Sequence, residues 1–201
     1  MFQPGKIIKN RYKINRYLTS GGFGDIYEVS DRHSTKILKI LQPFADPEKQ
    51  QIAIKLFQRE AKVLQQLNHP GIPRVDADGY FLWQDTDEIY RCLIMEKIPG
   101  QTLRQWRENN PLPLTQSQAF DWFKQTIDIL DYLHQNNYIH RDLKPSNIIL
   151  KPKGKLAAID FGSVRLINGT YLAKFADNLE VTKISTKGYA PIEQIRGKQV
   201  P

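Results

Sequence analysis

Short apolar segments separated by turn-forming residues occupy much of the first hundred positions, which is typical of strands. One longer segment, 48–68, instead carries apolar residues at helical spacing, among them Leu56 and Phe57. The turn-forming residues 68–71 end this segment. The pattern predicts strands over 12–18, 25–29, 35–41, 80–83 and 89–95. It therefore indicates a small antiparallel sheet with one helix.

The second half of the chain has a different pattern. Pro99-Gly100 interrupts the strands and predicts a boundary between lobes 1–98 and 99–201. A short helix is expected over 103–109. Thr115 and Gln118 then form a capping box, and the helix they open should close at Asn136-Asn137. Its apolar residues are expected on one face: Phe120, Phe123, Ile127, Leu130 and Leu133. The predicted fold class is α+β, with a sheet-rich N-terminal lobe and a mainly helical C-terminal lobe.

Composition and charge narrow the possibilities. Of 201 residues, 40% are hydrophobic and 25% charged, as in soluble globular proteins. The net charge is +8, but the basic residues are scattered, so we expect no nucleic-acid binding. No apolar run is long enough to cross a bilayer, and no signal peptide is evident, so we expect a cytoplasmic chain without membrane association. Cys92 is the only cysteine, which excludes an internal disulfide, and the histidines lack zinc-ligand spacing.

Two interpretations fit the glycine-rich segment Thr19-Ser20-Gly21-Gly22-Phe23-Gly24. It could be a plain hairpin turn. It leads into a predicted strand, whereas a dinucleotide-binding fingerprint leads into a helix, and no P-loop sequence occurs. We therefore favour a glycine-rich hairpin whose backbone N–H groups approach phosphates.

Lys39 lies in the middle of an apolar strand, where Ile37 shares its face and Leu38 and Ile40 face the other way. Alone, it could simply extend to solvent. Glu60, however, falls among the apolar positions of the predicted 48–68 helix. A carboxylate on an inward face requires a cation, so we expect it to pair with Lys39.

Two loops carry acidic and amide side chains next to apolar runs. His140-Arg141-Asp142-Leu143-Lys144-Pro145-Ser146-Asn147 precedes 148–150, and Asp160-Phe161-Gly162 follows 156–159. Asp142 and Asp160 could merely cap turns, but that leaves the rest of the string unexplained. A base, a cation and two oxygen ligands suited to Mg²⁺ fit phosphoryl transfer, which depends on positioning and charge neutralisation.

These motifs, with Thr186-Lys187-Gly188-Tyr189-Ala190-Pro191-Ile192-Glu193, resemble the eukaryotic-like serine/threonine protein kinase family. The last segment is similar to bacterial members. The resemblance implies a two-lobed kinase fold, ATP and Mg²⁺ as cofactors, and a protein substrate with a serine or threonine. It implies Asp142 as base, Lys144 at the transferred phosphoryl group, Lys39 with Glu60 on the nucleotide, and Asn147 and Asp160 as Mg²⁺ ligands. It assigns the nucleotide site to Thr19, Gly21, Gly22, Phe23, Gly24, Ile26, Ile37, Lys39, Met95, Glu96, Ile98 and Ile149.

The chain departs from the family pattern at three points. Thr19 replaces the first glycine of the loop, which should stiffen it. Ile37 replaces the usual alanine and should narrow the adenine pocket. The third departure is the end at Pro201, before several helices of the family's C-terminal lobe. We therefore expect a truncated catalytic domain whose 115–137 helix is partly bare unless a partner or a second copy covers it.

Arg141, beside the expected base, suggests control by phosphorylation of the segment between Gly162 and Glu193. The candidate acceptors are Thr182, Ser185 and Thr170. Two alternatives to an active kinase stay open at this point: a nucleotide-binding regulatory module without turnover, and an inactive fragment.

Overall fold

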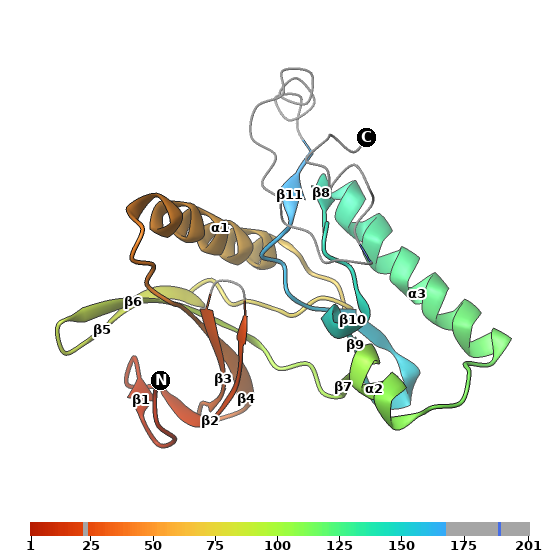
Figure 1. Ribbon diagram of the computed structural model, residues 1–201, viewed down its shortest axis with the longest axis horizontal. Coiled ribbons are helices and arrows are strands. Elements are labelled where there is room, and N and C mark those ends of the chain that lie inside the picture. The colour runs from red at the N-terminus through yellow and green to blue at the C-terminus, as the bar shows by residue number, and fades with distance from the viewer. Residues whose placement is uncertain (22–23, 168–188, 190–201) are drawn as a thin grey trace. The chain divides into compact units, whose positions relative to one another are not determined.

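The computed structural model describes residues 1–21, 24–167 and 189 (Figure 1). Contacts within the chain divide it into two compact units. Unit 1 comprises Met1–Asn68 and Pro73–Lys97, and unit 2 comprises His69–Ile72 and Ile98–Pro201.

Unit 1 is built on a six-stranded antiparallel sheet with the strand order β1-β2-β3-β4-β6-β5. Its strands are β1 (Ile7–Ile8), β2 (Tyr12–Gly21), β3 (Gly24–Ser30), β4 (Thr35–Leu41), β5 (Tyr80–Asp85) and β6 (Glu88–Glu96). The five predicted strands are therefore all present, and β4 has the predicted bounds. β2 runs three residues further than predicted, so the strands around the glycine-rich segment stay paired up to Gly21 and Gly24.

The alternating pattern separates the two faces of this sheet. One face forms the core of unit 1: Ile8, Tyr12, Ile14, Tyr27, Val29, Leu38, Ile40, Cys92 and Ile94 are buried together. Because successive residues of a strand point to opposite faces, Lys39 and Leu41 face the other side. The predicted division of β4 into these two faces is confirmed.

α1 (Pro47–Gln66) is the one helix among the described residues of unit 1, and it covers positions predicted to be helical. Asp46 is its N-cap, and its carboxylate accepts hydrogen bonds from the backbone N–H groups of Glu48 and Lys49. Phe57 and Leu64 lie on the buried side of the helix. Ile52, an apolar residue at helical spacing in the same segment, is instead 48% exposed.

Gly24, where β3 begins, lies too close to the neighbouring strand for any side chain. A Cβ atom added there would be 2.1 Å from the carbonyl oxygen of Ile40. This approach requires glycine for packing reasons alone, because backbone atoms cannot move away as a flexible side chain can.

Unit 2 contains helices and short strands. In chain order these are β7 (Gln101–Thr102), α2 (Leu103–Asn109), α3 (Gln116–Gln135), β8 (Tyr138–Ile139), η1 (Pro145–Asn147), β9 (Ile148–Leu150), η2 (Pro152–Gly154), β10 (Leu156–Ala158) and β11 (Arg165–Leu166). The short strands form a three-stranded sheet, β10-β9-β7, and a pair, β11-β8. α2 has the predicted bounds, whereas the two-residue strands were not predicted.

Helix α3 begins as predicted, with a capping box between Thr115 and Gln118, and its C-cap is Asn136. Of the residues predicted on its apolar face, Leu133 is buried as expected, but most of the others are not. The buried residues of α3 are Ile129 and Leu133. The predicted positions Phe120, Phe123 and Ile127 are 56%, 61% and 47% exposed. The expectation of a partly bare apolar face on this helix is therefore confirmed. Ile129 is buried although it was not among the predicted positions of the apolar face.

Candidate active site

A buried ion pair joins the sheet and the helix of unit 1. The Lys39 ammonium lies 2.9 Å from Oε1 and 2.7 Å from Oε2 of Glu60. The two side chains are only 7% and 2% exposed. The expected contact is confirmed, and its physical reason is the one anticipated: a carboxylate on the inward side of α1 is stabilised there by a cation.

The strand register places several of the predicted nucleotide residues on the face of the sheet that carries Lys39. Directly opposed residues of paired strands point to the same face. Ile26 is opposite Lys39 and also opposite Thr19, since β3 pairs with both β4 and β2. Ile37 lies two residues from Lys39 in β4 and is opposite Met95 of β6. This face therefore combines the apolar side chains of Ile26, Ile37 and Met95 with the buried Lys39–Glu60 pair.

The other predicted nucleotide residues are distributed over both units. Glu96 ends β6, where its backbone N–H donates to Arg74 O at 2.8 Å and its carboxylate accepts from Arg74 N at 3.2 Å. Ile98 and Ile149 belong to unit 2. Gly21 is exposed and Gly24 buried, while Gly22 and Phe23 lie outside the described residues.

In unit 2, the two predicted catalytic loops are brought together by the β9–β10 hairpin. Ile148 pairs with Ala158 at the end of this hairpin. Beyond that pair, the N–H of Ile159 donates to the carbonyl oxygen of Asn147 at 2.8 Å. Asn147 closes the first loop, and Asp160, the next residue after Ile159, opens the second. The apolar runs noted in the sequence thus act as strands that align the two polar loops.

Asp142 is held in place by two donors from its own loop. Its Oδ2 accepts a hydrogen bond from Lys144 Nζ at 2.8 Å and another from Asn147 Nδ2 at 3.0 Å. Asn147 Nδ2 also donates to the backbone carbonyl of Asp142 at 3.0 Å. The Asp142 side chain is 11% exposed. The Asp142–Asn147 contact was not predicted, although their spacing across the short η1 helix could have suggested it.

The oxygen atoms at this end of the hairpin suit a magnesium ion. The Nδ2 group of Asn147 donates to Asp142, and the other end of the same amide carries an oxygen, Oδ1, that can act as a ligand. Asp160 adds a carboxylate from the adjoining loop. Mg²⁺ is commonly held by one or two protein oxygens together with phosphate oxygens and waters, so Asn147 and Asp160 fit that role.

His140 and Phe161 form the buried support of the two loops. Their rings lie 5.0 Å apart in an edge-to-face arrangement, and both residues are 1% exposed. Burial lowers the pKa of His140, against an opposing effect of Asp160 and Asp142. The neutral ring accepts a long hydrogen bond at Nδ1 from the N–H of Asp142, at 3.4 Å. His140 therefore contacts Phe161 of the second loop through its ring and Asp142, the expected base, through its Nδ1.

Arg141 adopts a left-handed backbone conformation, with φ of 64°. Its Nε donates to the carbonyl oxygen of Ser163 at 3.0 Å. The candidate phosphorylation sites Thr170, Thr182 and Ser185 lie outside the described residues, as do Tyr171, Thr186 and the segment around Pro191, of which only Tyr189 is described.

Comparison with known proteins agrees with this geometry. Residues 12–200 match the protein kinase domain family. The chain belongs to this family. It is 31% identical over 198 residues to a probable serine/threonine-protein kinase PknB of Lactococcus lactis, covering 98% of this chain and 30% of that protein. It is 33% identical over 208 residues to serine/threonine-protein kinase C of Synechocystis, covering 100% of this chain and 38% of the relative.

A third relative, serine/threonine-protein kinase PknA of Nostoc, is 33% identical over 203 residues, which cover 97% of this chain and 35% of that protein. The chain thus spans about a third of the length of these relatives. The match confirms the family inferred from the motifs and the kinase fold class. Within the part of the chain that the structure describes, no helix is long and apolar enough to cross a membrane.

Proposed function

We propose that this chain is the catalytic domain of a serine/threonine protein kinase, which transfers the γ-phosphoryl group of ATP to a protein hydroxyl. The observation that carries the proposal is the position of Asp142, whose carboxylate is fixed between Lys144 and Asn147 beside the loop that carries Asp160. The family match and the names of the relatives support it.

In this proposal, Asp142 orients the attacking hydroxyl and accepts its proton. The hydrogen bonds from Lys144 and Asn147 restrict the carboxylate to one orientation, which favours the alignment that phosphoryl transfer requires. Lys144, a cation with several donor hydrogens, stabilises the negative charge that spreads over the transferred phosphoryl oxygens. Its contact with Asp142 holds the positive charge of Lys144 next to the base.

Lys39 binds the α- and β-phosphates of the nucleotide, and Glu60 keeps its ammonium from turning elsewhere. Asn147 and Asp160 would hold Mg²⁺, which would supply positive charge against the phosphates of the nucleotide. The apolar positions Ile26, Ile37 and Met95 line the base-binding surface of unit 1. The acceptor is a serine or threonine of a protein.

The test is phosphoryl transfer by Asp142→Asn, which keeps the side-chain volume and removes the basic carboxylate. We expect incorporation of phosphate from γ-labelled ATP into a generic basic protein to fall by a factor of about 100 or more, with ATP binding retained. Asp87→Asn, in the exposed turn between β5 and β6, is the matched control and should leave the rate unchanged. Equal rates for wild type and Asp142→Asn would reject the proposal, as would ATP binding without transfer in wild type.

A further inference from the structure

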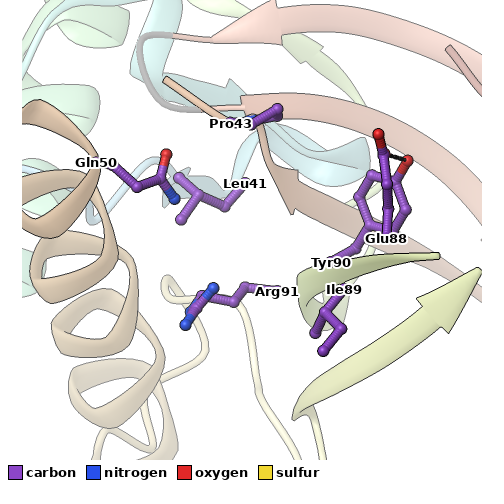
Figure 2. A pocket seen from close by; sticks show the side chains of 7 residues that line it. All are labelled: Leu41, Pro43, Gln50, Glu88, Ile89, Tyr90 and Arg91. Atoms are coloured by element: carbon purple, nitrogen blue, oxygen red, sulfur yellow. Dashed lines mark hydrogen bonds between the residues drawn. The ribbon is translucent and has the colours of Figure 1, made fainter. Parts of the chain in front are cut away.

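The start of the chain, residues 2–6, packs on the core face of the sheet in unit 1 through Phe2, and we call it the N-terminal strap. The Phe2 ring lies among aromatic rings from three strands, at centroid distances of 6.1, 5.3 and 5.0 Å: Tyr27 of β3, Trp83 of β5 and Tyr90 of β6. The Tyr90 hydroxyl donates to the Glu88 carboxylate, which fixes the orientation of the Tyr90 ring (Figure 2). Three strands therefore form an ordered aromatic slot for the second residue of the chain.

The other end of the strap is attached to β2 and β5. The N–H of Gly5 donates to the carbonyl oxygen of Ile14 at 2.8 Å, and the N–H of Ile14 donates to the carbonyl oxygen of Lys6 at 2.8 Å. The Lys6 ammonium pairs with Asp85 and lies 4.8 Å from the centre of the Phe2 ring. The strap is therefore held against the sheet at both of its ends.

A chain of hydrogen bonds leads from the strap to the start of β3. The N–H of Phe2 donates to the Tyr27 hydroxyl at 3.2 Å, and that hydroxyl donates to Oδ2 of Asp25 at 3.3 Å. Gln42 Nε2 donates to the same Asp25 oxygen at 2.6 Å. Burial raises the pKa of Tyr27, so the hydroxyl keeps the proton that it donates. The second residue of the chain is thus connected to the carboxylate of Asp25.

Asp25 occupies a position from which it can place part of the proposed nucleotide site. It lies between Gly24 and Ile26, both assigned to that site, and it is only 8% exposed. Gly24 pairs with Leu41 at the end of the β3–β4 ladder, and Gln42 is the next residue of the chain. Burial of a carboxylate is unfavourable unless donors reach it, and here the donors are a hydroxyl and an amide. Their positions therefore determine where β3 begins.

The strap acts on nucleotide binding and not on the catalytic groups. A displacement of Asp25 moves its neighbours Gly24 and Ile26, whereas Asp142 and Lys144 belong to unit 2. Backbone N–H groups bind a phosphate only at hydrogen-bond distance, so a small shift of Gly24 weakens that contact. A defect in the strap should therefore change the affinity for ATP rather than the rate at saturating ATP.

We propose that the N-terminal strap positions the glycine-rich end of β3 for ATP, and that Asp25 is the positioning residue through which it acts. The inference rests on the proposed function, because Gly24 and Ile26 are assigned to the ATP site there. The attachment of the strap to β3 can be tested without any phosphoryl transfer.

Hydrogen exchange tests that attachment. In Tyr27→Phe, the amides of residues 24–26 and 40–42 should exchange about tenfold faster than in wild type, because a buried carboxylate loses a donor. The amides of β5 should keep their rates. Tyr12→Phe is the matched control, since Tyr12 belongs to the same core and is 2% exposed, but its hydroxyl is not part of the chain of hydrogen bonds. Unchanged exchange at 24–26, or equal acceleration throughout unit 1, would overturn the proposal.

Phe2→Ala is the second variant, for use if Tyr27→Phe fails to fold. It removes the ring that anchors the strap and should accelerate exchange of the amides at 24–26 by about threefold or more. Ile7→Ala is its control, because Ile7 is next to the strap and 58% exposed. Equal exchange at 24–26 in Phe2→Ala and Ile7→Ala would contradict the role of the strap.

ATP kinetics test the positioning residue. Asp25→Ala should raise KM for ATP by about tenfold, with kcat within about a factor of two of wild type. Asp25→Asn should restore KM, because both donors reach one oxygen and an amide oxygen accepts two hydrogen bonds. A fall in kcat at unchanged KM, or no rescue by asparagine, would contradict the role of Asp25. If wild type binds ATP without transfer, the proposed function fails, and the same comparison made with Kd for ATP still decides this inference.

Discussion

Replacement of Glu60 by leucine separates the structural and catalytic contributions of the buried ion pair. Glu60 is 2% exposed and both of its oxygens contact the Lys39 ammonium. Glu60→Leu therefore removes a carboxylate that contacts a buried cation. Removing one partner of a buried pair costs about 3–5 kcal/mol, which is a large part of the ~5–15 kcal/mol that stabilises a typical domain.

The assay is urea unfolding followed by circular dichroism. With a slope of about 2 kcal/mol per molar urea, a loss of about 3–5 kcal/mol lowers the midpoint by roughly 1.5–2.5 M. Glu108→Leu is the matched control, because Glu108 and Arg104 form an exposed pair with 61% and 71% side-chain exposure. Such pairs contribute at most about 1 kcal/mol, so its midpoint should shift by less than about 0.5 M.

The double variant Lys39→Met/Glu60→Leu completes the cycle. Replacing both partners by apolar residues removes the buried charge, and such exchanges are often neutral or stabilising. We expect the double variant to recover most of the stability that Glu60→Leu loses, while phosphoryl transfer stays lost. A midpoint for Glu60→Leu within about 0.3 M of wild type would refute the assigned cost. Full activity in the double variant would reject the proposed role of Lys39.

Three further predictions concern stability. Gly24→Ala should lower the free energy of unfolding by about 1–3 kcal/mol, measured in urea, because its Cβ would lie 2.1 Å from a backbone oxygen. Gly21→Ala, whose nearest contact is 3.7 Å, should lower it by less, and equal losses would contradict this. Below about pH 6.5 the urea midpoint of unfolding should fall, because burial lowers the pKa of His140 and the unfolded chain then binds more protons than the folded chain. The same dependence of the midpoint on pH in His140→Phe would count against this explanation. Phe123→Ser should reduce binding of a hydrophobic dye with little loss of stability, whereas Leu133→Ser, 0% exposed, should destabilise by more than about 2 kcal/mol; equal dye binding by wild type and Phe123→Ser would argue against a bare face.

The sequence predicted elements whose pattern is local. β4 is a short run rich in isoleucine and leucine and α2 carries its own capping box, and both have the predicted bounds. The pairing of Lys39 with Glu60 was also predictable, because a carboxylate on the inward face of a helix favours a cation beside it and a mid-strand lysine supplies one. Strands of two residues, such as β8 and β11, could not be predicted, since they exist only through pairing with each other.

Features that depend on tertiary packing were missed or only partly predicted. The inward side of α3 is set by what packs against it, so Ile129 is buried while Phe123 is exposed, although helical spacing alone favoured the latter. Gly24 was interpreted as a phosphate-binding glycine, yet the approach of β4 already requires it. Arg91 reads as an ordinary polar residue of an alternating strand, and only the folded chain shows its Nε without a partner.

The central claim is that this chain moves the γ-phosphoryl group of ATP to serine or threonine. The most direct measurement incubates it with a generic protein substrate, magnesium and ATP labelled in either the α- or the γ-phosphate, and then analyses the phosphorylated amino acids. We expect phosphoserine or phosphothreonine labelled from γ-labelled ATP only, with no label when magnesium is chelated. Release of free phosphate without labelled protein, or label confined to tyrosine, would contradict it.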